Sequence, residues 1–251
     1  MRCALLTAPA LFLALAAATP LTAQTISPEL RAALADKTRP QADRDRDAAR
    51  HPLELLSLAA IKPGQKVADF MMGGGYFTRI LSNAVGPKGH VYAYQAGEFI
   101  GFRPAYGDEQ KAAAARRANV TPLNMKIGEI AFPEKLDAII TVQNYHDLYL
   151  SFGGPAYAEA VTKRLYDALK PGGTFLVVDH VANADPDFAA PNKLHRIDPA
   201  AARRAIEKTG FHFVSESKLL ADPADPHDKN VFDPSIRGKT DQFIFLFRKP
   251  G

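Results

Sequence analysis

The chain has 251 residues, with 31 basic and 27 acidic side chains and a formal net charge of +4 at pH 7. This mild charge, without a dense basic run interleaved with aromatic residues, argues against a nucleic-acid-binding protein. The sequence holds one cysteine, Cys3, so disulfides, thiolate catalysis and thiolate metal sites are excluded from the rest of the chain. A chain of this length can bury an adequate core without such crosslinks.

Residues 1–23 have the pattern of a secretory signal peptide. Arg2 supplies a positive start, residues 4–18 are an apolar run, and small residues follow as candidate cleavage sites. An uncleaved anchor is the alternative, but the run is short for a membrane span. No later apolar run is long enough to cross a bilayer, so we expect an exported, periplasmic protein with no stable membrane span.

Residues 24–52 are expected to form an N-terminal helical extension, followed by a single main domain at 53–251. The extension ends in a run of alternating charge at 43–50, which is typical of a solvated helix surface. We expect one or two surface helices here. His51, beside Arg50, is a candidate for closing over a ligand from this side of the domain. A helix is expected next, at 52–61.

Residues 66–81 indicate a strand, a tight turn and a helix. A short apolar run containing Asp69 leads into Gly73, Gly74 and Gly75, and apolar residues then recur at helical spacing. Glycines at such a turn let a ligand approach the main chain closely. In an open α/β sheet the first such turn lies where the strand order reverses, and ligands bind there.

The second strand is expected at 90–95, ending in Gln95 with Glu98 shortly after it. A helix is expected at 108–118 and a third strand with its exit at 124–129, which includes Gly128 and Glu129. The fourth strand, at 136–143, is apolar on both faces, as a central parallel strand should be.

Polar side chains follow this fourth strand directly. Asn144, His146 and Asp147 come at its carboxyl end, where catalytic groups collect in parallel sheets. Helices at 157–169 and 199–210 and strands at 174–179, 211–220 and 242–247 complete the pattern. Residues 222–241, rich in Asp, Pro and Lys, form a long insertion that we expect to be a binding loop or lid.

These features, in this order over residues 53–249, resemble the class I S-adenosylmethionine-dependent methyltransferases. Asp69, Gly73 and Gly75 match the first motif of that family, with Met71 where its first glycine belongs, and the LKPGG turn at 169–173 is a more specific match. The leader, the strand exit at 144–147 and the blocks at 194–198 and 232–241 resemble a group of exported bacterial predicted methyltransferases.

The resemblance implies a doubly wound, Rossmann-like α/β sandwich. Its sheet would have seven strands in the order 3-2-1-4-5-7-6, mostly parallel, with the last strand antiparallel. It also implies S-adenosylmethionine as cofactor and an unidentified small molecule as methyl acceptor. The implied cofactor-binding residues are Asp69, Gly73, Gly74, Gly75, Gln95, Glu98, Gly128, Glu129 and Asn144.

Two of these positions leave the mode of cofactor binding open. The family has an acid near Gln95 that bonds both ribose hydroxyls, whereas an amide offers a single acceptor oxygen. Either Glu98 substitutes for this acid or ribose binding is weaker. Glu129 matches the acid that lies beside the adenine amino group in the family.

His146 is the candidate general base, because an imidazole titrates near neutral pH. Asp147 and Asn144 complete the predicted catalytic set, and Asp179 is another possible partner of the ring. His195 and Arg196 precede a helix, and Arg196 is a candidate for clamping an anionic substrate group.

Other functions stay open at this point. One is a non-catalytic protein that binds S-adenosylmethionine or a nucleoside on the same fold, which the departures at Met71 and Gln95 favour. A less favoured one is an NAD(P)-dependent oxidoreductase. Asp-Pro pairs mostly form turns, so we expect no metal site in the insertion. Its possible ligands would be Asp222, Asp225, His227, Asp228 and Asp233.

Overall fold

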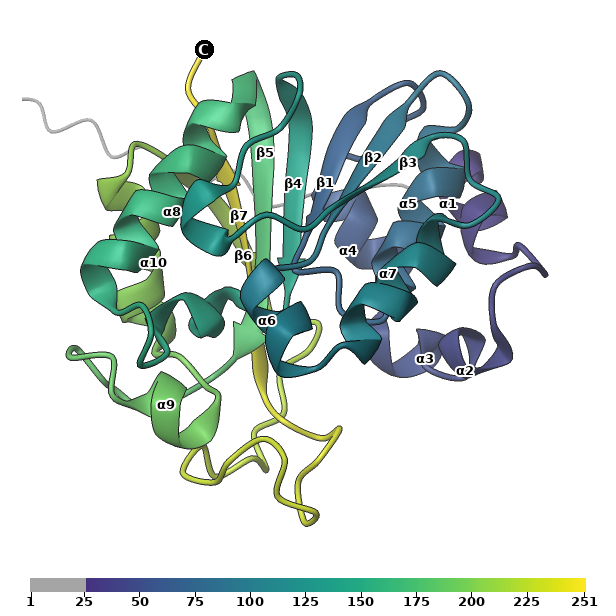
Figure 1. Cartoon of the computed structure of the whole chain (residues 1–251). Coiled ribbons are helices and arrows are strands. Elements are labelled where there is room, and N and C mark those ends of the chain that lie inside the picture. The colour runs from purple at the N-terminus through teal and green to yellow at the C-terminus, as the bar shows by residue number, and fades with distance from the viewer. Residues whose placement is uncertain (1–25) are drawn as a thin grey trace, which may run out of the picture.

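A seven-stranded sheet forms the centre of the computed structural model, which describes residues 26–251 (Figure 1). The strand order is β3-β2-β1-β4-β5-β7-β6; the first five strands of this order are parallel, and β7 is antiparallel to both its neighbours. The predicted fold class and strand order are therefore confirmed. The strands are β1 (Lys66–Phe70), β2 (His90–Tyr94), β3 (Val120–Leu123), β4 (Leu136–Val142), β5 (Leu169–His180), β6 (His212–Ser217) and β7 (Gln242–Arg248).

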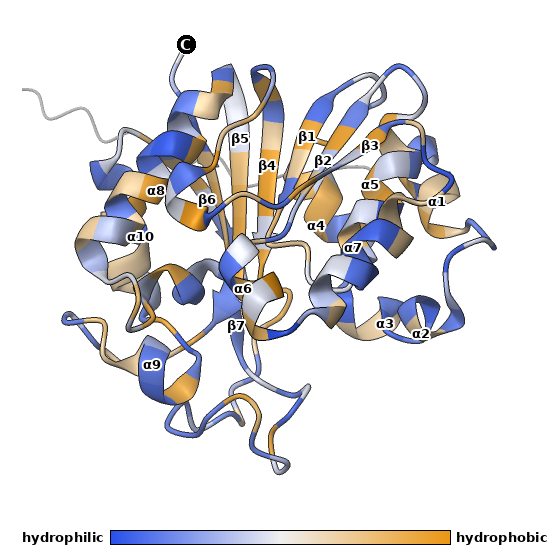
Figure 2. Ribbon diagram, in the orientation of Figure 1, coloured by the Kyte–Doolittle hydropathy of each residue, from blue (hydrophilic) through white to orange (hydrophobic). Residues whose placement is uncertain are grey.

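Helices cover both faces of this sheet. Side chains alternate along each strand, so Ile139 and Ile140 of β4 lie in two different apolar cores. One core lies under α1 (Pro28–Leu34), α4 (Pro52–Leu58), α5 (Tyr76–Val85) and α7 (Ala105–Ala114). The other lies under α8 (Pro155–Ala168) and α10 (Pro199–Lys208). Figure 2 shows the matching pattern, with apolar strands inside and hydrophilic residues on the outer helix surfaces.

Short helices lie around the carboxyl end of the sheet (Figure 1). They are α2 (Gln41–Arg44), α3 (Asp47–Arg50), α6 (Gly97–Phe102), α9 (Ala190–Leu194) and the 3-10 helices η1 (Ile127–Glu129) and η2 (Tyr145–Tyr149). Within residues 26–251, no helix is both long enough and apolar enough to cross a membrane. The predicted signal peptide, residues 1–23, lies outside the described residues.

The charged N-terminal extension differs from the prediction of a solvated surface. Arg39 is only 1% exposed and pairs with Asp47 at 2.6 Å. Asp47 also accepts a hydrogen bond from the Tyr76 hydroxyl, and Asp43 pairs with Arg79 at 2.6 Å. Asp45, Arg46, Ala48 and Ala49 are exposed as predicted. The prediction fails for Asp43 and Asp47, because their partners, Arg79 and Tyr76, are on α5, more than 25 residues further along the chain.

The third strand also lies earlier than predicted. It spans residues 120–123, and residues 127–129 form η1 instead of a strand exit. Pro122 argues against a strand at this position in the sequence, because a proline lacks the N–H that an interior strand needs. β3 is at the edge of the sheet, where a missing donor is tolerated.

Candidate functional site

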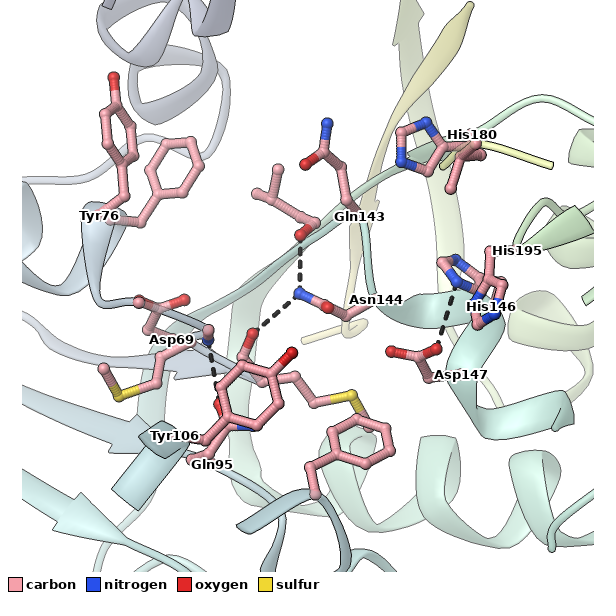
Figure 3. A pocket seen from close by; sticks show the side chains of 18 of the residues that line it. Asp69, Tyr76, Gln95, Tyr106, Gln143, Asn144, His146, Asp147, His180 and His195 are labelled. Carbon is pink, nitrogen blue, oxygen red and sulfur yellow. Dashed lines mark hydrogen bonds and ion pairs between the residues drawn. The ribbon is translucent and has the colours of Figure 1, made fainter. Parts of the chain in front are cut away.

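A cavity of about 690 Å³ lies at the carboxyl ends of β1, β2 and β4 (Figure 3). Its volume lies within the range of small-molecule sites, which is roughly 300–1,000 Å³. The strand order reverses at this point, because the chain runs outward from β1 to β3 and then returns to β4. The cavity is lined by eight predicted site residues: Asp69, Gly73, Gly74, Gln95, Glu98, Asn144, His146 and Asp147.

The glycine turn forms the floor on the β1 side. Gly73 and Gly75 have φ angles of +54° and +77°, a left-handed conformation that glycine adopts without a steric penalty. A Cβ on Gly73 would meet nothing within 4 Å, whereas one on Gly75 would lie 2.4 Å from the Ala113 Cβ. Gly73 therefore faces open space in the cavity, and Gly75, which does not line it, is a packing position.

Gln95 supports this turn from the end of β2. Its side chain is 1% exposed, and its Oε1 accepts a hydrogen bond of 3.0 Å from the Gly73 N–H. The oxygen that could accept from a ribose hydroxyl is therefore already engaged by the main chain. Gln95, which stands where class I methyltransferases have an acid, therefore holds the glycine turn in place.

Met71 stands where the resembled family has a glycine, and the structure gives the physical reason for that glycine. Met71 has a φ of +60°, in the left-handed region that side chains disfavour. The Asn144 amide donates to the Met71 carbonyl at 2.8 Å and to the Val142 carbonyl at 2.7 Å. Asn144 thus ties the exit of β1 to that of β4, and both its N–H donors bond to main chain.

Asp69 lies beneath the turn, with 3% of its surface exposed. Burial raises the pKa of its carboxyl to about 6, although the Thr78 hydroxyl, donating at 2.6 Å, opposes the shift. This bond joins the end of β1 to the first turn of α5. Asp69 therefore fixes the geometry of the strand–turn–helix unit in addition to lining the cavity.

Two arginines of the N-terminal extension, Arg46 and Arg50, line the cavity beside the glycine turn. The Arg50 guanidinium lies 4.8 Å from the centre of the Tyr76 ring and donates to the Gln143 Oε1 at 3.2 Å. Burial lowers the pKa of Arg50 to about 10, so it remains charged at neutral pH. The predicted candidate, His51, does not line the cavity, and neither Arg46 nor Arg50 was predicted to do so.

Of the residues predicted to bind the ribose and adenine of the cofactor on this side, only some line the cavity. Both Glu98 carboxylate oxygens accept from the Ile127 N–H, at 3.2 and 3.1 Å, and Glu98 lines the cavity. Gly128 and Glu129 do not line it. A Cβ on Gly128 would lie 3.1 Å from the Tyr157 ring, so this glycine accommodates α8.

His146 lies at the opposite end of the cavity, beside Asp147 (Figure 3), and its ring is held between the carboxylates of Asp147 and Asp179. Its Nδ1 is 2.8 Å from Asp179 Oδ1 and its Nε2 is 3.2 Å from Asp147 Oδ1. Asp179 also accepts from the His146 backbone N–H at 2.7 Å. The ring of His195 lies 5.5 Å from that of His146, centre to centre, nearly at right angles to it.

This pairing changes the protonation expected for His146. Burial alone would lower the pKa of its ring, but the charges of Asp179 and Asp147 outweigh burial and raise the pKa to about 10. The prediction that this ring titrates near neutral pH is therefore wrong. In contrast, burial lowers the pKa of His195 and brings that of His180 to about 4, so His180 is neutral at pH 7.

The insertion at 222–241 is fastened by a buried ion pair. Arg196 Nη1 and Nη2 donate to the two oxygens of Asp225, at 2.7 and 2.9 Å, and both side chains are 0% exposed. The predicted clamp on a substrate anion is wrong, because this guanidinium faces Asp225. Val231 and Phe232 of the insertion line the cavity, and the Phe232 ring lies 5.0 Å from that of His195.

No protein-family model and no curated protein sequence matches this chain. Among solved structures it is similar to an S-adenosylmethionine-dependent methyltransferase from Aquifex aeolicus, with a TM-score of 0.59 and 19% identity over 84% of this chain and 99% of that one. The fold is that of the class I methyltransferases.

Two further solved structures share this fold but are described differently. The cyclase SpnF matches with a TM-score of 0.58 and 13% identity, over 85% of each chain. A possible exported protein from Bordetella parapertussis matches with a TM-score of 0.53 and 17% identity, over 85% of this chain and 71% of that one. At such low sequence identities these similarities show the fold alone, and the function has to be argued from the residues of the site.

Proposed function

We propose that the protein transfers a methyl group from S-adenosylmethionine to a small molecule. This proposal rests on the layout of the cavity. One end has the glycine turn and the Arg50 guanidinium, and the other end has the polar side chains of His146 and Asp147. Methyl transfer from a sulfonium requires alignment of donor and acceptor and exclusion of water more than covalent help. A cavity with two chemically distinct ends is suited to both requirements.

In this proposal the donor occupies the β1 side. Its ribose and amino acid lie against Gly73 and Gly74. Glu98 shares one N–H donor, that of Ile127, between its two oxygens, so it keeps acceptor lone pairs for the ribose hydroxyls. Arg50 and Arg46 face the amino acid carboxylate. The Aquifex aeolicus protein with the same fold is described as a methyltransferase, which supports this donor.

The acceptor occupies the side of His146 and Asp147. A general-base role for His146 requires a ring without a proton on Nε2, and the flanking carboxylates oppose that state. We therefore propose that His146 and Asp147 first of all position the acceptor. Phe232, which lines the cavity beside His195 and is about half exposed, provides apolar contact for the body of the acceptor.

Calorimetric titration of the purified protein tests the proposal against its two alternatives. We expect binding of S-adenosylmethionine and of its demethylated product, and none of NADH or NADPH. Labelled donor with a panel of phenols, amines, thiols and acids then tests transfer. Firm donor binding without transfer to any acceptor would favour a non-catalytic binding protein, and binding of NADPH alone would favour an oxidoreductase.

Arg50→Gln should weaken donor binding by roughly 10- to 100-fold, because it removes a charge-assisted hydrogen bond worth about 1.5–3 kcal/mol. The affinity for adenosine, which has no carboxylate, should stay unchanged. Isothermal titration with both ligands measures the difference. Arg103→Gln is the control, because Arg103 pairs with Glu109 on the surface and does not line the cavity. Equal loss for both ligands would contradict the carboxylate contact.

We also propose that the protein is exported and loses residues 1–23. The positive start, apolar run and small residues of the leader support this. A possible exported protein shares the fold. Intact-mass measurement of the periplasmic protein should show a chain that begins between Thr19 and Thr25. A full-length mass in the membrane fraction would contradict the proposal.

A further inference from the structure

Three side chains at the acceptor end converge on one point. His146, Asp147 and His195 each offer one ligand atom, and these atoms all lie within 4.8 Å of one another. His146 and Asp147 belong to η2, whereas His195 ends α9 and has a left-handed φ of +51°. All three line the cavity, so a bound ion there would remain accessible to a ligand.

Two imidazoles and one carboxylate are a donor set for divalent transition metals. Imidazole nitrogen suits Zn²⁺, Fe²⁺ and related ions, and hard ions such as Mg²⁺ prefer oxygen ligands only. Three protein ligands leave one or more coordination positions for water or substrate, as in catalytic zinc sites. The group is therefore different from the Asp-rich insertion, in which Asp225 and His227 are already paired.

An independent observation concerns the orientation of the His146 ring. Asp179 is fully buried and lies 2.8 Å from Nδ1, while its second oxygen accepts from the His146 backbone N–H. A carboxylate on the far nitrogen of a histidine fixes the tautomer in which the other nitrogen is free to bind a metal. Here that other nitrogen is Nε2, which faces Asp147 and the cavity.

The charges at this point also favour a cation. Asp147 and Asp179 bring two carboxylates to one ring, and Asp179 has no exposed surface. Without a metal ion, the positive charge between these carboxylates is that of the protonated His146 ring, and a metal ion bound to Nε2 would replace the proton there. A buried carboxylate is stable only when it is paired or coordinates a metal.

We propose that His146 Nε2, the Asp147 carboxylate and His195 bind one divalent transition-metal ion, with Asp179 orienting His146. The open positions of the ion face the cavity beside Phe232 and would take an oxygen, nitrogen or sulfur atom of the acceptor. The site is independent of the methyl donor, so its test requires no S-adenosylmethionine.

The test is metal retention by the purified mature protein, stripped with a chelator and then dialysed against Zn²⁺. We expect one equivalent of Zn²⁺ by elemental analysis. Co²⁺ in its place should give visible absorption bands. Asp179→Asn should weaken Zn²⁺ binding by about 10–100-fold, as changes in such orienting carboxylates do. His195→Asn and Asp147→Asn, which remove ligands, should weaken it further.

His227→Asn is a matched control for His195→Asn. Both histidines have left-handed backbone, with φ of +60° and +51°, and asparagine tolerates that conformation. His227 lies in the insertion and is paired with Asp241 at 2.8 Å. Metal-free thermal melts show whether each variant folds. The proposal is overturned if the wild type retains no Zn²⁺, or if folded His195→Asn and His227→Asn retain it equally.

Discussion

Replacing Gly73 by asparagine should reduce S-adenosylmethionine affinity by roughly 100-fold, near the top of the range of about 1–3 kcal/mol that overpacking costs. Gly73 has a left-handed φ of +54° and lines the cavity, and its Cβ would enter open space. Asparagine tolerates this backbone better than other side chains do. The added atoms would therefore occupy ligand space without strain, and calorimetry with a parallel thermal melt measures both effects.

Gly64→Asn is the matched control for this variant. Gly64 also has a left-handed φ, of +84°, and its Cβ would meet nothing within 4 Å, but it lies far from the cavity lining. It should bind the donor as the wild type does. Unchanged affinity in a stable Gly73→Asn protein would exclude the glycine turn as the donor site.

Asp225→Ala should lower the free energy of unfolding by about 3–5 kcal/mol, because it leaves the buried Arg196 charge without its partner. Both side chains of this pair are 0% exposed. Chemical denaturation measures the change. Glu159→Ala is the control, because its exposed pair with Lys208 should contribute at most about 1 kcal/mol. A similar small effect for Asp225→Ala would show that the insertion is not held by this pair.

The same pair gives a pH dependence with a definite sign. Burial alone would raise the pKa of Asp225, but hydrogen bonds from Arg196 and from the backbone N–H groups of Asp241 and His227 outweigh it and lower the pKa below 3.8. Its contribution is therefore fully present above that value and is lost as the pH falls through the lower pKa of the folded state. Asp225→Ala should show a smaller loss of stability over this acid range than the wild type.

The parts of the structure that follow from local sequence were predictable. Residues 136–143 are apolar on both faces, and β4 is the central strand; the glycine turn after Asp69 lies at the cavity. The parts that were missed depend on contacts between distant elements. Nothing near His146 in the sequence shows that His195 lies beside its ring, whereas Asp179, at the end of the adjacent strand β5, was a predicted partner and does contact Nδ1.

The same limit explains the charged extension and the insertion. An alternating run of charge is compatible with a solvated helix until Tyr76 and Arg79 are seen to approach it. The sequence alone gives no partner for the positive charge of Arg196, and only the folded chain shows that Arg196 forms an ion pair with Asp225. Charged residues therefore need their partners identified before a role can be assigned to them.

Three residues with side chains in a left-handed backbone conformation, Met71, Gln143 and His195, line the cavity. Each such residue carries a steric penalty of about 1–2 kcal/mol that glycine would avoid. Selection or engineering for heat resistance alone would therefore tend to replace them by glycine or asparagine. The resulting protein would have a higher melting temperature, but it would have lost side chains that line the cavity. Substitutions that raise thermostability without weakening ligand binding would therefore have to be made at other positions of the chain.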